Sequence, residues 1–126
     1  MSETLAKRVP CLKRLPQIFR NKLDSTLLKL IEHSEELDIS EVYLFGSCAR
    51  GDYDATSDID FLILTQGDRK RASIDIEMQD IRDEFGYPNV DIVVRSKKNF
   101  NSDCDKVFYP YVVNDLQLLW QKGCPN

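Results

Sequence analysis

The chain has 126 residues, which is enough for one compact domain with a hydrophobic core. Its 42% hydrophobic and 30% charged residues are typical of a soluble globular protein, and no apolar run approaches the roughly 20 residues of a membrane span. The formal net charge of −4 disfavours a protein that coats nucleic acid, so we expect no stable binding to DNA or RNA.

Charge is unevenly distributed along the chain. Residues 1–22 hold six Lys or Arg and one acid, whereas residues 32–60 hold nine acids and one base. We expect residues 1–16 to form a basic arm, either solvated or docked on an acidic partner, and residues 17–126 to form a single domain. The four cysteines lack C-x-x-C spacing and there is one histidine, so no zinc site is expected. With no secretory segment, we expect a cytoplasmic protein with reduced thiols.

The first elements follow from hydrophobic spacing. Apolar residues recur with helical period over residues 17–37, which predicts an amphipathic helix. Residues 41–45 are predicted to form a first strand, and residues 47–51 a short helix that stops at a glycine. Residues 58–64 are predicted to form a second strand. Because this strand is apolar on both faces after its acidic start, we expect it to lie at the centre of a sheet.

The later elements complete a two-layer α/β arrangement. Residues 74–85 carry apolar side chains spaced by four, three and four positions, which predicts a helix. Residues 90–94 are predicted to form a third, short strand, and a further helix begins near Asp103. Residues 116–120 fit either an edge strand or the last turn of that helix. The order of helices and strands predicts one layer of helices packed on one sheet.

Two short motifs stand where these elements meet. Asp58 and Asp60 project from the same face of the second strand, because side chains alternate along a strand. Two carboxylates held in this way are suited to a hard cation. Gly46 and Ser47 lie where a strand turns into a helix, and backbone N–H groups at such a turn suit phosphate. A metal site beside a phosphate cradle is what nucleotide chemistry requires.

Asp91 is the third informative acid, because it interrupts an apolar strand. A carboxylate in that position needs a partner. If the third strand neighbours the second, Asp91 faces Asp58 and Asp60, and three carboxylates would repel one another without a cation such as Mg²⁺. Taken alone, a Gly-Ser pair after a strand is usually a turn, an Asp-x-Asp pair is often a strand cap, and an acid within a strand often pairs with a nearby Lys or Arg. Their combination, in the context of strand, Gly-Ser turn, helix and strand, favours a site.

Other residues near the motifs have two interpretations. Alternating acids from Asp52 to Asp60 resemble a calcium loop, but the glycine and the glutamate that an EF-hand requires are absent, so Asp52 and Asp54 are expected to shape the loop. Arg50 could reach a phosphate, or it could be a structural partner of Asp52 or Asp54. Cys48 is either a reactive thiol or, as we favour, a small buried filler.

The run from Gly46 to Gly51, followed by Ser57-Asp58-Ile59-Asp60, resembles the DNA polymerase β-like nucleotidyltransferase superfamily. It is most similar to the small stand-alone branch, the minimal nucleotidyltransferases, which include antitoxins of the MntA type. The resemblance covers about residues 42–94, and Asp91 falls where the family places its third carboxylate. It implies a small palm-like α/β fold in which a mixed sheet is packed with helices.

The resemblance also implies an activity, in which a nucleoside monophosphate moves from an NTP, AMP from ATP in the first instance, to an acceptor hydroxyl. In that family pattern Asp58 and Asp60 bind the Mg²⁺ that carries the triphosphate, and Asp91 completes the metal site. Gly46 and Ser47 would contact the phosphates, and Arg50 is a further candidate for phosphate binding.

The acceptor is expected on another molecule, because the roughly 30 residues after the third strand are too few for a second domain. The resemblance implies a helical HEPN-type partner, with this chain as the antitoxin that places AMP on a partner tyrosine. Two alternatives stay open, a partner-binding module without catalysis and a nucleotidyltransferase for small molecules such as antibiotics. In each case we expect a hetero- or homo-oligomer.

Overall fold

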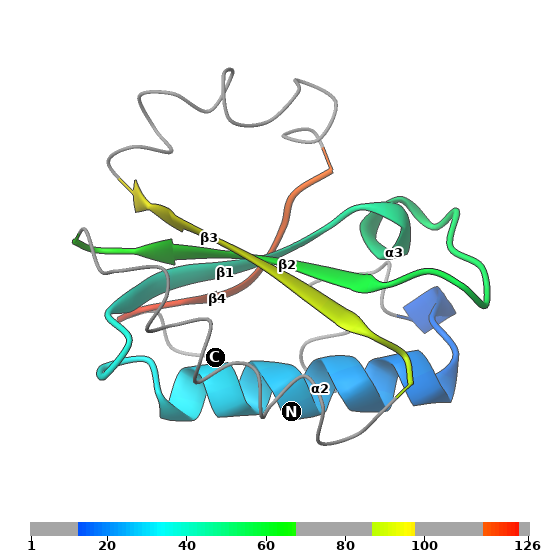
Figure 1. Cartoon of the computed structure of the whole chain (residues 1–126), viewed down its shortest axis with the longest axis horizontal. Coiled ribbons are helices and arrows are strands. Elements are labelled where there is room, and N and C mark those ends of the chain that lie inside the picture. The colour runs from blue at the N-terminus through cyan, green and yellow to red at the C-terminus, as the bar shows by residue number, and fades with distance from the viewer. Residues whose placement is uncertain (1–12, 68–86, 98–114, 124–126) are drawn as a thin grey trace.

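The computed structural model describes residues 13–67, 87–97 and 115–123. Within these ranges the chain forms two α-helices and four β-strands (Figure 1). Their bounds are Gln17–Glu32 for α2, Ile39–Phe45 for β1, Ser47–Arg50 for α3, Ile59–Thr65 for β2, Val90–Ser96 for β3 and Gln117–Gln121 for β4. The predicted helices over residues 74–85 and after residue 103 lie outside the described residues.

The four strands form one mixed sheet in the order β3-β2-β1-β4. β2 pairs parallel with β3, whereas β1 pairs antiparallel with both β2 and β4. The predicted α/β fold with a mixed sheet is therefore confirmed, and so is the central position of β2. Residues near 116–120 form an edge strand rather than the end of a helix. Among the described residues, no helix has the length and apolar character that a membrane span needs.

The two faces of the sheet have different roles. Residues 59, 61 and 63 of β2 pack in the main core with Leu23 and Leu27 of α2, which runs along this face in Figure 1. Even-numbered residues of β2 point to the opposite face, where Leu62 and Leu64 are buried. Asp60 belongs to this second set. The acids of the predicted site therefore lie on the face of the sheet that α2 does not cover.

Helix α2 is shorter than the sequence predicts. The apolar pattern indicates a helix up to Leu37, but the helix ends at Glu32 and the chain turns before β1. Leu37 is buried in the core from within this turn, which is why it continued the apolar pattern. Asp38 has a left-handed φ of 59°, which an α-helix cannot continue. Of the expected basic arm, residues 13–16 are described, and Leu15 among them is buried against the core.

Neighbouring leucines of α2 provide a test of this packing. Leu27 is 1% exposed and Leu28 is 47% exposed. We expect Leu27→Ala to lower the free energy of unfolding by about 2–5 kcal/mol, because it leaves a cavity under the sheet. Leu28→Ala is the control and should cost less than about 1 kcal/mol. Urea unfolding measures both, and equal losses would contradict the assigned face of α2.

Candidate functional site

Gly46 forms the turn between β1 and α3. Its φ of 78° and ψ of −157° lie in a region that residues with a Cβ atom rarely occupy. A Cβ here would lie 2.2 Å from Oδ2 of Asp60, so the missing side chain leaves the space in which that carboxylate sits. Ser47, the first residue of α3, is half-buried beside it. The predicted glycine turn thus stands directly against one of the predicted acids.

Asp60 and Asp91 are register partners on the parallel strands β2 and β3. Paired residues of adjacent strands project to the same face, so the two carboxylates lie side by side on the face opposite α2. Asp58 precedes β2 by one residue and is near enough to act electrostatically on Asp60. The condition that the third strand neighbours the second is met, and it places Asp91 beside Asp60 with Asp58 close enough to affect Asp60.

The environment of Asp60 opposes its ionisation. Burial, then the charges of Asp91 and Asp58, raise the pKa of Asp60 from 3.8 to about 6, while Arg50 acts in the opposite direction. A half-buried carboxylate between two others is a costly arrangement in the absence of a cation. A carboxyl group whose pKa is raised in this way, beside a glycine that makes room for it, is a candidate for a binding site.

The donor set fits a hard divalent cation such as Mg²⁺, because carboxylate oxygens are the ligands that this ion prefers. As the side chains stand, no three His, Cys, Asp or Glu residues within the described ranges are grouped so that they could hold a metal ion. Asp58 and Asp91 are exposed, and the charges of both act on Asp60. The three acids are therefore candidate ligands that are not arranged as a formed metal site.

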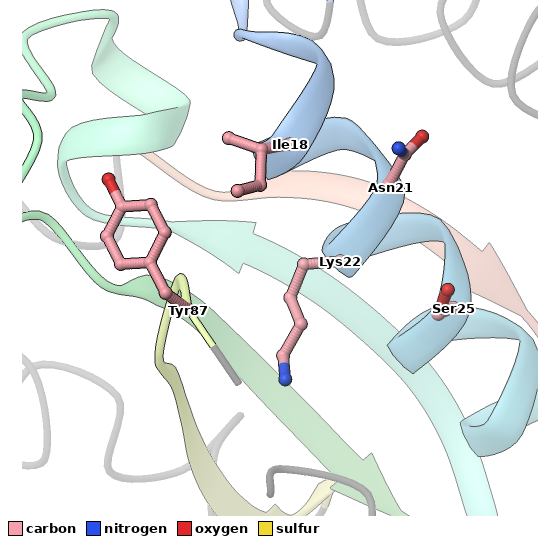
Figure 2. A pocket seen from close by; sticks show the side chains of 5 residues that line it. All are labelled: Ile18, Asn21, Lys22, Ser25 and Tyr87. Carbon is pink, nitrogen blue, oxygen red and sulfur yellow. The ribbon is translucent and has the colours of Figure 1, made fainter. Parts of the chain in front are cut away.

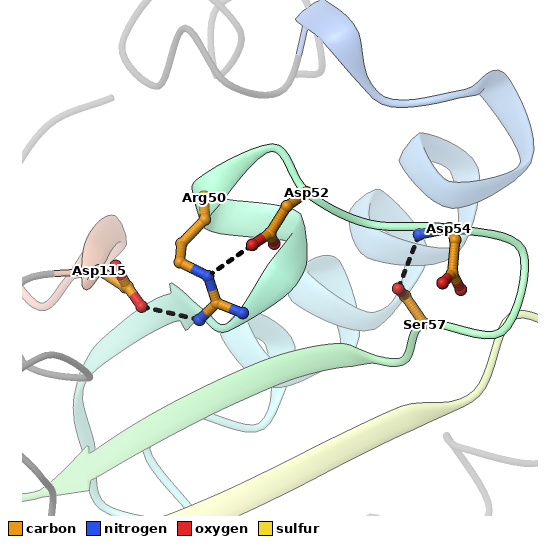
Figure 3. Close-up of polar contacts among 5 residues, drawn as sticks. All are labelled: Arg50, Asp52, Asp54, Ser57 and Asp115. Carbon is orange, nitrogen blue, oxygen red and sulfur yellow. Dashed lines mark hydrogen bonds and ion pairs between the residues drawn. The ribbon is translucent and has the colours of Figure 1, made fainter.

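Arg50 is held by two carboxylates (Figure 3). Its Nε donates to Asp52 at 3.2 Å and its Nη1 donates to Asp115 at 2.9 Å. The bond to Asp115, and then that to Asp52, raises the pKa of Arg50 above its ordinary value. The structural interpretation, with Asp52 as partner, is therefore correct for this structure, and a contact with phosphate stays a prediction. Sequence analysis gave no signal for Asp115, which ties α3 to the start of β4.

The loop after α3 is shaped by its own side chains. Asp54 accepts hydrogen bonds from the backbone N and from Oγ1 of Thr56, at 2.8 and 2.6 Å, and these bonds lower the pKa of Asp54. The backbone N of Asp54 donates to Oγ of Ser57 at 2.8 Å (Figure 3). The predicted role of Asp54 in the turn is confirmed. Cys48 is buried and its Sγ donates to the backbone oxygen of Asp58, as expected for a small filler.

A second polar group lies farther along the same face of the sheet. Glu41 is 7% exposed, accepts a hydrogen bond of 2.6 Å from the Tyr43 hydroxyl and pairs with Lys97 at 3.3 Å. Burial and then this hydrogen bond raise the pKa of Tyr43 above its usual range, so it stays a proton donor. Nothing in the sequence indicates the ion pair of Glu41 with Lys97, because these two residues come together only when β1 and β3 join one sheet.

Comparison with known proteins gives a family for this arrangement. The model of the nucleotidyltransferase domain family matches residues 25–116, which include every residue predicted for the site. A crystal structure of a putative nucleotidyltransferase from Sulfolobus solfataricus is 33% identical to this chain. That match covers 80% of this chain and 87% of the other, with a TM-score of 0.45. No curated protein matches the chain.

The close approach of Gly46 and Asp60 predicts an effect on metal binding. In Gly46→Ala the new methyl group displaces the Asp60 carboxylate, so we expect Mg²⁺ affinity, measured by calorimetry, to fall about tenfold or more. The backbone strain should cost about 1–3 kcal/mol of stability.

Gly51→Ala is the matched control for this substitution. Gly51 also has a positive φ, of 89°, but a Cβ there would meet no atom within 4 Å. It should lose about 1–2 kcal/mol of stability from strain while keeping the Mg²⁺ affinity of the wild type. Equal loss of Mg²⁺ affinity in both variants would show that strain, and not the displaced carboxylate, is responsible.

The raised pKa of Asp60 predicts how stability depends on pH. The unfolded chain releases this proton near pH 3.8, whereas the folded chain keeps it until about pH 6. The metal-free protein should therefore lose stability as the pH rises from about 4 to about 6. A shift of one pKa unit corresponds to about 1.4 kcal/mol, and solvent screening of this half-buried group reduces the total loss to about 1–2 kcal/mol.

Asp60→Asn, which cannot ionise, should remove this loss in metal-free buffer. Urea unfolding of both proteins between pH 4 and pH 7 in EDTA measures the difference. Addition of Mg²⁺ at pH 7 should stabilise the wild type more than the variant. Parallel pH profiles of the two proteins would contradict the raised pKa.

Proposed function

Since this chain belongs to the nucleotidyltransferase domain family, we propose that it transfers a nucleoside monophosphate, AMP from ATP, to an acceptor hydroxyl. The observation that carries the proposal is the pairing of Asp60 with Asp91 on parallel strands, beside a glycine whose missing side chain admits the Asp60 carboxylate. Mg²⁺ is the proposed cofactor. Because the reaction uses ATP, the expected cytoplasmic location is part of the proposal.

The reaction is a displacement at the α-phosphorus. The acceptor oxygen forms a bond to this phosphorus, the bond to the β-phosphate oxygen breaks, and pyrophosphate leaves with the electron pair. Bound Mg²⁺ would neutralise the triphosphate and stabilise the attacking and leaving oxygens.

Each site residue has a separate proposed role. Asp58 and Asp60 would bind the Mg²⁺ that carries the triphosphate of the nucleotide. Exposed Asp91 would complete the metal site and help to activate the acceptor hydroxyl, whose proton leaves as the new bond to phosphorus forms. Gly46 and Ser47 bring backbone close to the phosphates at the start of α3.

As the acceptor we propose a tyrosine on a HEPN-type helical partner, so that this chain acts as the antitoxin of a pair. The support is the sequence resemblance to minimal nucleotidyltransferases, together with the exposure of Asp58 and Asp91, which leaves their carboxylates within reach of a hydroxyl on another protein.

Mass spectrometry tests the proposal. The purified chain is incubated with ATP and Mg²⁺, with and without a HEPN-type protein encoded next to it, and in parallel with GTP, CTP and UTP. We expect the partner to gain the mass of AMP on a tyrosine. Asp58→Asn should lower the rate by about 100-fold or more, because several kcal/mol of charge stabilisation are lost with a metal ligand. Glu35→Gln, an exposed acid at the far end of β1, should leave the rate unchanged.

Other results of this experiment would favour one of the two alternative functions, partner binding or transfer to a small molecule. A stable complex that forms without modification, and survives Asp58→Asn, would replace catalysis with partner binding. Transfer to small hydroxyl compounds in the absence of any partner would replace the antitoxin role with a small-molecule activity.

A further inference from the structure

The loop that carries Asp58 is anchored to the rest of the protein by two tyrosines. The Tyr53 hydroxyl donates to the backbone oxygen of Arg14, and the Tyr87 hydroxyl donates to the backbone oxygen of Ala55 at 2.7 Å. The bonds of Asp54 described above close the turn, but they lie within the loop. The tyrosine contacts join the loop to other elements, as do the bond from Cys48 to the backbone oxygen of Asp58 and the backbone bond from Ile59 to Asn89.

Both tyrosine rings contact the same residue of α2. Phe19 lies 5.9 Å from Tyr53 in a tilted arrangement and 5.9 Å from Tyr87 in an edge-to-face arrangement, measured between ring centroids. The two tyrosines differ in what they connect. Tyr53 ties the loop to the segment before α2. Tyr87 lies four residues before Asp91 and ties the loop to the start of β3.

Tyr87 is restrained by its hydroxyl bond to Ala55 and by its edge-to-face contact with Phe19. The residue is 50% exposed, and its ring borders a pocket of about 230 Å³. The other residues that line this pocket are Ile18, Asn21, Lys22 and Ser25 of α2. Figure 2 shows the ring beside Ile18, with its hydroxyl turned away from Lys22. A ring with open space on one side is less restrained by packing, so the bond to Ala55 contributes to fixing its position.

We propose that Tyr87 is a positioning residue for the metal site. Its hydroxyl holds Ala55, three residues before Asp58, at a fixed distance from the strand that carries Asp91. The two exposed carboxylates thereby approach the same cation from neighbouring segments. Tyr87 acts through the backbone of the loop and not by contact with the metal or substrate. The inference rests on the proposed function, which supplies the metal.

The test compares Tyr87→Phe with Tyr53→Phe in the full chain. Each substitution removes one hydroxyl bond to a backbone oxygen and keeps the ring against Phe19. Mn²⁺ binding is measured by electron paramagnetic resonance, and unfolding is measured in EDTA. We expect Tyr87→Phe to bind Mn²⁺ about 3- to 10-fold more weakly than the wild type, as the loss of one hydrogen bond allows. Tyr53→Phe should lose similar stability but keep the wild-type Mn²⁺ affinity.

A second readout separates positioning from general destabilisation. In the transfer assay, Tyr87→Phe should raise the Mg²⁺ concentration for half-maximal rate, with the KM for ATP unchanged at saturating Mg²⁺. Equal Mn²⁺ affinities in the two variants would overturn the role of Tyr87 while leaving the proposed function in place. A wild-type protein that binds no Mn²⁺ would overturn the metal site itself and this inference with it.

Discussion

The repulsion between Asp60 and Asp91 is the constraint on which the site depends. Parallel pairing of β2 and β3 places the two acids at the same level of the sheet. Burial and neighbouring charge then make ionisation of Asp60 unfavourable. An apolar side chain would stabilise the half-buried position of Asp60 more in a protein that only needed to fold. The sheet therefore holds neighbouring carboxylates whose mutual repulsion a bound cation would offset.

Gly46 makes this arrangement possible at the neighbouring strand. Its positive φ directs the chain from β1 into α3, and its missing Cβ admits the Asp60 carboxylate. Arg50, one turn later in α3, is close enough to counter part of the negative charge while it bridges Asp52 and Asp115. The short helix thus joins the acids of β2 to the edge strand β4 through a few polar contacts.

Local sequence patterns predicted much of this site, because its central motifs are local. Strand geometry alone predicts that Asp58 and Asp60 share a face, and the end of an apolar run predicts the turn at Gly46. The pairing of Asp91 with Asp60 was a conditional expectation, since it depends on which strands become neighbours. The sequence predicts α2 too long, because Leu37 continues the helical spacing of apolar residues although it is buried from the turn that follows the helix.

The contacts that could not be predicted join residues distant in the chain. Nothing in the sequence around Tyr87 indicates a bond to Ala55, 32 residues earlier. Likewise, Asp115 accepts a hydrogen bond from Arg50, 65 residues earlier, and Glu41 of β1 forms an ion pair with Lys97, which follows β3. Such contacts follow from strand order, which hydrophobic periodicity does not encode.

The bridge from Arg50 to Asp115 has a consequence for protein synthesis. Asp115 leaves the ribosome 65 residues after Arg50, and β4, which follows it, pairs with β1. A nascent chain that already contains all three acids therefore still lacks Asp115, which ties α3 to the start of β4. The sheet and the bridge from Arg50 become complete only when residues 115–121 have been translated, whereas β2 and β3, whose pairing places Asp60 beside Asp91, come earlier in the chain.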